Sequence, residues 1–177
     1  MAVDASTFRA LFGTVPGVVA VVTTLDGDEP AGLTTSAVCE VSLDPPLLLV
    51  CLDERSRTLP RILRSGAFTV NYLAGHRRDL AARFAGSGAD KFTDVPWTGS
   101  PGARGAPRLD DASAAHAECT VRHAVPLGDH TVVVGLVEAV TVTGHAPLLY
   151  RRGTYRAWSD AATVVPAVAR PNPRELA

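Results

Sequence analysis

The stretch AGLTTSAVCEVSLDPPLLLVCLDERSRT, residues 31–58, holds a strand, a turn, a second strand and a polar turn in close succession. Its first part carries small and hydroxyl-bearing side chains, namely Thr34, Thr35, Ser36 and Ala37. After the turn at 44–46, an apolar strand is predicted at 47–52, and the cluster ERSRT follows it. Hydroxyls and backbone amides beside a cationic turn favour a flat polar ligand that carries a phosphate, a chemistry that suits a flavin.

Length and composition restrict the class of protein. At 177 residues the chain fits one domain, predicted at 1–160, with a Pro-rich tail at 161–177. The formal net charge of −1 argues against nucleic acid or an anionic membrane as a partner. No apolar run approaches the roughly 20 residues of a membrane helix, and no signal peptide is visible. Three cysteines without a CxxC pair favour reduced thiols and a cytoplasmic location.

The hydrophobic pattern predicts mainly β structure with a few short helices. Helices are predicted at 4–12, 57–64 and 77–85. The second has Thr58 at its N-cap and Gly66 just past its end. Strands are predicted at 17–25, 31–43, 47–52, 67–73, 116–125, 130–143, 148–151 and 155–158, and residues 17–43 are expected to form one hairpin. Residues 86–107, rich in Gly and Pro, are expected to form a long loop. Strands without regular strand–helix alternation predict an antiparallel barrel.

Several kinds of site are excluded by spacing. His116, Cys119 and His123 lie on one predicted strand, but they do not come together on one face at ligand distance, so no metal site is predicted. The sequence has no G-x-S-x-G elbow for a serine nucleophile. It also has neither a dinucleotide fingerprint nor a Walker-type loop. Any nucleotide must therefore bind by another scheme.

The polar turn supplies such a scheme. Thr58 at a helix start leaves backbone amides that attract a phosphate. Arg55 and Ser56 add charge and hydroxyl donors, and Lys91, the one lysine of the chain, can reach in from the long loop. The alternative interpretation is that Thr58 only caps its helix, that the arginines are solvated, and that the hydroxyls of 34–36 face water.

The order of the motifs resembles that of the short-chain flavin reductases, the reductase components of two-component flavin-dependent monooxygenases. The matching segments are FRALFGTVPGVVAVVTT, GLTTSAVCEVSLDPPLLLVCL, SRT at 56–58, FTVNYLA at 68–74, RFAG at 83–86, DKF at 90–92, GDHTVVVGLVEAV at 128–140 and PLLYRRGTYRAW at 147–158. The resemblance covers about residues 6–158. The co-occurrence of GLTTSA, SLDPP, SRT and GDH in this order is more specific than any one of them.

The resemblance implies an FMN-binding split β-barrel, antiparallel and Greek-key-like, that works as a homodimer. It implies that the flavin ring and ribityl chain are lined by Thr34, Thr35, Ser36 and Ala37, and that Cys51 and Leu52 close the pocket. Ser56, Thr58 and Lys91 are expected at the phosphate, with Phe92 beside them. Tyr155 is expected to reach the site. Ala37 departs from the family, since many members have a second serine there.

His130, in the GDH motif, is expected to face the nicotinamide and to orient it, held by Asp129. A surface histidine at a strand start is the alternative. The resulting hypothesis is an NAD(P)H:flavin oxidoreductase that reduces FMN or FAD with NADH or NADPH and supplies reduced flavin to a partner monooxygenase. Two alternatives keep the barrel: a non-enzymatic flavin- or haem-binding protein, and an FMN oxidase similar to the pyridoxamine-phosphate oxidases.

Overall fold

The computed structural model describes residues 2–88 and 90–159, so the Pro-rich tail predicted from residue 161 lies outside it. Three α-helices occur in this part of the chain: α1 Ala5–Thr14, α2 Leu59–Ser65 and α3 Arg78–Ala85. The strands are β1 Gly17–Val18, β2 Ala20–Asp26, β3 Glu29–Thr35, β4 Val38–Leu43, β5 Pro46–Asp53, β6 Ala67–Leu73, β7 Thr98–Gly99, β8 Pro107–Arg108, β9 Ser113–Leu127, β10 His130–Val142, β11 Leu148–Arg151 and β12 Thr154–Ala157. Two short 3-10 helices occur between α3 and β9: η1 Pro101–Ala103 lies within the predicted long loop 86–107, and η2 Asp110–Ala112 follows it.

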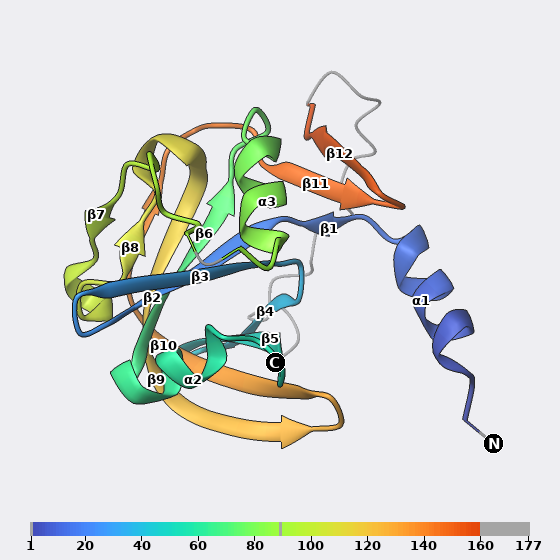
Figure 1. The fold of residues 1–177 in the computed structure, drawn as a ribbon, viewed down its shortest axis with the longest axis horizontal. Helices are drawn as coiled ribbons and strands as arrows, with labels where there is room; N and C mark the ends of the chain where they lie inside the picture. Colours follow the sequence, from blue (N-terminus) through green and yellow to red (C-terminus); the bar gives the residue numbers. More distant parts are fainter. Residues whose placement is uncertain (1, 89, 160–177) are drawn as a thin grey trace, which may run out of the picture.

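A seven-stranded sheet forms the body of the protein, with the order β3-β2-β6-β9-β10-β5-β4 (Figure 1). Every neighbouring pair in it is antiparallel. Its two edge strands, β3 and β4, are consecutive in the chain and are joined only by Ser36 and Ala37. The sheet must therefore curl until its edges meet at this junction, although no ladder closes them. The prediction of a mainly β, antiparallel split barrel is confirmed.

The predicted hairpin over residues 17–43 is wrong at both ends. Only β2 and β3 form a hairpin, in which Ala20 pairs with Thr35. After Ser36 the chain crosses to the opposite edge of the sheet, where β4 pairs with β5. At the other end, β1 separates from β2 and pairs with β11 in a small sheet of order β1-β11-β12. No Gly or Pro separates β1 from β2 or β3 from β4. The strands end at these points because β1 and β4 pair with strands other than β2 and β3.

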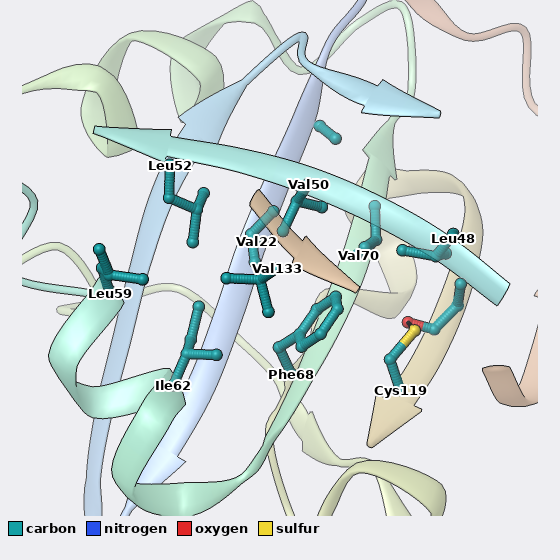
Figure 2. Packing of buried hydrophobic residues seen from close by; sticks show 12 residues of the cluster. Val22, Leu48, Val50, Leu52, Leu59, Ile62, Phe68, Val70, Cys119 and Val133 are labelled. Carbon is teal, nitrogen blue, oxygen red and sulfur yellow. Dashed lines mark hydrogen bonds between the residues drawn. The ribbon is translucent and has the colours of Figure 1, made fainter. Parts of the chain in front are cut away.

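Apolar side chains of five strands and α2 fill the inside of the curved sheet (Figure 2). The labelled members are Val22, Leu48, Val50, Leu52, Leu59, Ile62, Phe68, Val70, Cys119 and Val133. A second cluster, which includes Leu80, Ala81 and Phe84, lies beneath α3. These three residues are the buried face that the amphipathic pattern of this helix predicts. The two clusters lie on opposite faces of β2, because Ala20 and Val22 belong to the first and Val21 belongs to the second.

The helix α1 stands apart from this body (Figure 1). Asp4 caps its first turn, since one carboxylate oxygen accepts hydrogen bonds from the N–H groups of Ser6, at 2.8 Å, and Thr7, at 2.9 Å. None of its residues is buried, although Phe8, Leu11 and Phe12 are apolar. Among the described residues, no helix has the length and apolar character needed to cross a membrane.

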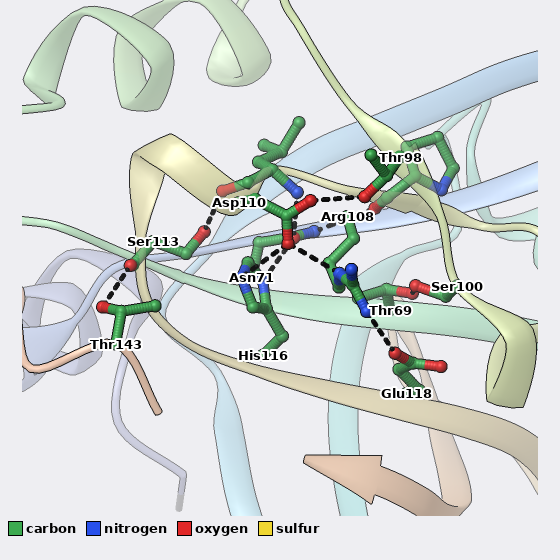
Figure 3. Close-up of polar contacts among 12 residues, drawn as sticks. Thr69, Asn71, Thr98, Ser100, Arg108, Asp110, Ser113, His116, Glu118 and Thr143 are labelled. Atoms are coloured by element: carbon green, nitrogen blue, oxygen red, sulfur yellow. Dashed lines mark hydrogen bonds and ion pairs between the residues drawn. The ribbon is translucent and has the colours of Figure 1, made fainter. Parts of the chain in front are cut away.

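A buried polar network anchors the long loop to β6 and β9 (Figure 3). The amide nitrogen of Asn71 donates to the carbonyl of Val21 at 3.1 Å, so its Oδ1 is the acceptor for the Leu109 N–H, at 2.9 Å, and for His116 Nδ1, at 3.1 Å. His116 therefore carries its proton on Nδ1. Its Nε2 has no hydrogen-bond partner and faces Asp110 at 3.6 Å. Among the described residues no group suited to hold a metal ion occurs.

Candidate functional site

A hollow of about 670 Å³ opens between β3, the turn after β5, the end of α3 and the start of β10. It is lined by residues 30–35, 51–53, 55–58, 61, 84–88, 91, 92 and 130. Four segments that lie apart in sequence meet here because of the strand order. In particular, β10 pairs with β5 so that His130 stands opposite Asp53. This pairing brings the GDH motif to the polar turn.

The helix α3 closes one side of the hollow by packing on β3. The hydroxyl of Thr34 donates to the carbonyl of Ala81 at 2.8 Å. Gly32 lets the helix approach, because a Cβ there would lie 2.9 Å from the ring of Phe84. Lys91 then joins the two elements, since its Nζ donates to the carbonyls of Gly32, at 3.2 Å, and Phe84, at 2.8 Å.

Two cations at this hollow have no carboxylate partner among the described residues. Lys91 contacts only main-chain carbonyls, and Arg57 donates from Nη2 to the carbonyls of Ser87 and, at 2.9 Å, Gly88. Burial, together with the nearby charge of Arg57, lowers the pKa of Lys91. Both groups leave a local positive charge that an anionic ligand can compensate.

Arg55 differs from Arg57 although both belong to the ERSRT cluster. Its guanidinium is paired with Asp53 at 2.7 Å, and its side chain is 89% exposed. The same contact holds the pKa of Asp53 well below its usual range. Arg61, a further lining residue, pairs with Glu29 at 3.0 Å. Sequence reasoning selected Arg55 and missed Arg57, because the sequence does not show which arginine faces a carboxylate.

The turn between β5 and α2 is fixed by local hydrogen bonds. The N–H of Ser56 donates to the carbonyl of Asp53 at 2.8 Å, and the N–H of Thr58 donates to Ser56 Oγ at 3.1 Å. Thr58 occupies the N-cap position of α2, as predicted, but its buried hydroxyl makes no capping bond. Ser56 and Thr58 both line the hollow.

His130, the first residue of β10, lies next to the turn between β5 and α2, opposite Asp53, and its imidazole contacts the side chain of Asp129. Its Nδ1 lies 2.8 Å from the carboxylate of Asp129, which lowers the pKa of that carboxyl. Because a carboxylate only accepts, Nδ1 carries the proton in the neutral imidazole, and Nε2 is left as an acceptor. His130 is 43% exposed and lines the hollow, whereas Asp129 is 90% exposed and does not.

The hydroxyl-rich segment enters the hollow only in part. Thr34 and Thr35 line it, and Thr35 Oγ1 accepts the N–H of Ala37 at 3.0 Å. Ser36 and Ala37 are exposed and lie outside the lining. Cys51 does line it, and burial raises the pKa of this thiol.

Apolar side chains complete the lining. Leu52 forms part of the wall, and Phe92 packs edge-on against Phe84, with ring centroids 5.0 Å apart. Tyr155 is placed elsewhere: it lies on β12 against Tyr150, at 5.1 Å between ring centroids, and outside the lining. The structure thus brings nine of the expected binding residues and His130 to one hollow, namely Thr34, Thr35, Cys51, Leu52, Arg55, Ser56, Thr58, Lys91 and Phe92.

The fold defines a split-barrel protein, whose hollow combines apolar walls with two cations that have no carboxylate partner in the described chain. Comparison with known proteins gives the family. Residues 12–159 match the family described as flavin reductase like domain. The chain belongs to this family.

Relatives and solved structures agree with this assignment. The chain is 47% identical to a flavin reductase (NADH) from Kitasatospora aureofaciens, over 88% of this chain and 83% of that protein. It is 37% identical to HsaB, the reductase subunit of a flavin-dependent monooxygenase from Rhodococcus jostii, over 92% and 83%. The crystal structure of nitrilotriacetate monooxygenase component B from Mycobacterium thermoresistibile matches with a TM-score of 0.87 and 35% identity, over 94% and 93%.

Proposed function

We propose that this protein is an NAD(P)H:flavin oxidoreductase that reduces FMN or FAD and supplies the reduced flavin to a partner monooxygenase. One observation carries the proposal: His130 shares a single hollow with Arg57 and Lys91, two cations without a carboxylate partner in the described chain. Membership of the flavin reductase-like family supports the reaction, and relatives that are monooxygenase reductase subunits support the partner.

The lining suits a flavin. A hollow of about 670 Å³ falls within the range of small-molecule sites. Arg57, Lys91 and Ser56 form its polar end and would hold the phosphate, while Cys51 and Leu52 would contact the ring. When bound, the flavin supplies the hydride acceptor, so the protein contributes binding and orientation. No protein nucleophile is required.

His130 would orient the second substrate. Asp129 fixes the imidazole through Nδ1, so Nε2 of the neutral ring carries no proton and can accept a hydrogen bond from an amide N–H. The carboxamide of a nicotinamide is such a donor. His130 is then a catalytic residue by contact with the substrate, and it forms no covalent bond.

The test is aerobic oxidation of NADH and NADPH with FMN and with FAD, followed for the wild type and for His130→Ala. We expect flavin-dependent oxidation by the wild type, and a loss of about tenfold or more in kcat/KM for the nicotinamide nucleotide in the variant. His123→Ala, an exposed histidine on β9, is the matched control. A wild type that oxidises neither nucleotide would overturn the function, and an active His130→Ala would overturn the role of that residue.

The proposal includes a homodimer. Phe8, Leu11 and Phe12 on α1 are 55%, 59% and 61% exposed, and the two phenylalanine rings contact each other, with centroids 5.0 Å apart. Since an aromatic side chain can bury about 150–250 Å², the two phenylalanines alone offer on the order of 200 Å². A stable interface needs about 800 Å² from each partner.

The remainder of that area is available on the same chain. Exposed apolar residues of β4 and β10, the strands that flank β5, are Val41, Leu43, Val140 and Val142. If α1 of one copy covers this surface on a second copy, two-fold symmetry forms the contact twice.

Two further expectations from the sequence also belong to the proposal. One is that residues 1–160 form the domain. The other is that the protein is cytoplasmic, since its three cysteines form no CxxC pair.

A further inference from the structure

A second hollow, of about 560 Å³, lies on the small sheet β1-β11-β12. It is lined by Pro16, Leu149, Arg151, Arg152, Thr154 and Arg156. None of these residues lines the first hollow. In Figure 1 this sheet lies between α1 and α3, to the side of the main sheet.

The strand register concentrates the charge in this second hollow. In the β11–β12 hairpin, Arg151 pairs with Thr154, and Leu149 pairs with Arg156. Because side chains alternate along a strand, these four residues project from the same face. The pair between them, Tyr150 and Tyr155, projects from the opposite face, where the two rings contact each other. Two guanidinium groups therefore stand beside one apolar side chain, and Arg152 adds a third from the turn.

These three arginines have no acidic partner within residues 2–88 and 90–159. None of the ion pairs in that part of the chain involves them. The one side-chain hydrogen bond that these arginines make in the described residues is from Arg151 Nε to the carbonyl of Thr14, at 2.8 Å, which leaves both terminal nitrogens of that side chain for a ligand.

The turn between β11 and β12 has an unusual residue for its backbone conformation. Arg152 and Gly153 form a two-residue connection, with φ of 48° and 78°. Hairpin turns with positive φ at both positions favour Asn, Asp or Gly, and a long side chain is uncommon there. An arginine in the first position is therefore uncommon for such a turn, and it places a third guanidinium at the second hollow.

We propose that this second hollow binds the phosphates of an ADP moiety. The guanidinium is suited to bidentate contacts with phosphate, and Pro16 and Leu149 offer an apolar floor for the attached ring. A volume of about 560 Å³ falls within the range of small-molecule sites. Such a site would also explain how a chain without a dinucleotide-binding fingerprint binds the ADP moiety of a dinucleotide.

The source of the ADP moiety rests on the function proposed above. NADH and NADPH carry an ADP moiety, FAD carries one, and FMN carries none. The strand β1 connects the two hollows: a Cβ at Gly17 would lie 3.0 Å from the Cβ of Ser36, which follows the hydroxyl segment of the first hollow. We assign the moiety to the nicotinamide nucleotide, because the first hollow already holds two cations for the flavin phosphate.

The direct test is calorimetric titration of the full-length protein with ADP-ribose, which lacks both nicotinamide and flavin. We expect binding by the wild type and a loss of about tenfold or more in affinity for the double variant Arg152→Gln/Arg156→Gln, since charge-assisted hydrogen bonds are removed. Arg122→Gln, which removes one positive charge from an exposed position on β9, should bind as the wild type does. Circular dichroism verifies folding. A wild type that does not bind ADP-ribose, or a double variant that binds it equally well, overturns the site.

Steady-state kinetics identify the source. With FMN as acceptor, the double variant should show an increased KM for NADH and an unchanged KM for FMN. An increase confined to the KM for FAD keeps the ADP site but overturns its assignment to the nicotinamide nucleotide. NADH oxidation by the wild type with FMN tests the proposed function separately: an active enzyme that ignores ADP-ribose refutes only this inference.

Discussion

Glu54, the residue after β5, is joined to Thr131 in β10, next to His130. The hydroxyl of Thr131 donates to the carboxylate of Glu54, and the N–H of Glu54 donates to the carbonyl of Asp129 at 3.0 Å. Glu54 thus holds the residues immediately before and after His130. Thr131 is buried, so its hydroxyl has few other partners.

Replacing Thr131 by Val removes this hydroxyl and keeps the shape of the side chain. We expect the backbone around His130 to loosen, so that the KM for NADH rises several-fold while flavin affinity stays constant. Steady-state kinetics with NADH and titration with flavin measure the two effects. Thr120→Val is the matched control, because it breaks a Thr–Glu bond of the same kind, to Glu138 at 2.7 Å, away from the hollow. Equal effects of both variants would refute a positioning role.

Arg57 and Arg55 should contribute unequally to flavin binding. Arg57→Gln removes a cation that faces the hollow without a carboxylate partner in the described chain, and we expect about a tenfold loss of FMN affinity. Arg55→Gln removes a cation already paired with Asp53, so its effect should be small. Fluorescence titration of FMN at two salt concentrations compares them. The proposal of Arg57 as a phosphate ligand fails if Arg55→Gln is the more damaging change.

The exposed face of α1 predicts the oligomeric state. The double variant Leu11→Ser/Phe12→Ser should shift the protein from dimer to monomer, because it removes two of the exposed apolar side chains. Light scattering after size exclusion measures the mass. Arg9→Gln, on the same exposed helix, should leave it unchanged. A wild type that is monomeric at micromolar concentration would contradict the prediction.

His116 predicts a dependence of stability on pH. Burial lowers its pKa from 6.5, and Arg108 acts in the same direction, while Asp110 and Glu118 oppose the shift. The unfolded chain therefore binds a proton more readily than the folded one. The free energy of unfolding should be highest above about pH 6.5 and should fall below it, by at most about 1.4 kcal/mol per pH unit.

Urea unfolding between pH 5 and 8 checks this dependence. His116→Gln should flatten the profile in this window, whereas His123→Gln, which changes an exposed histidine, should not. A wild-type profile that His116→Gln leaves unchanged would show that other groups produce the slope.

Much of the fold could be predicted from local pattern. The strand 67–73 and the buried face of α3 follow directly from β-branched residues and helical spacing. The break after Thr35 could not be predicted, because it arises where the chain moves from one edge of the sheet to the other. The detachment of β1 likewise depends on a strand 130 residues away or more, at 148–151.

The candidate site was predictable by motif and only partly by residue. His130 reaches the polar turn through strand pairing that no local signal contains. The choice between Arg55 and Arg57 depends on which of them meets a carboxylate, a matter of side-chain direction. Ser36 and Ala37 continue the motif but follow the end of β3, outside the lining.

Arg57 and Lys91 are held by main-chain carbonyls rather than by carboxylates. An arriving phosphate therefore displaces no counter-ion, and a departing one leaves no acidic side chain to compete for the next. Entry of a phosphate then requires no carboxylate–cation pair of the protein to break at this end of the hollow. Exit breaks only the contacts of the phosphate itself with the two cations, so the number of these contacts would set how long the ligand stays.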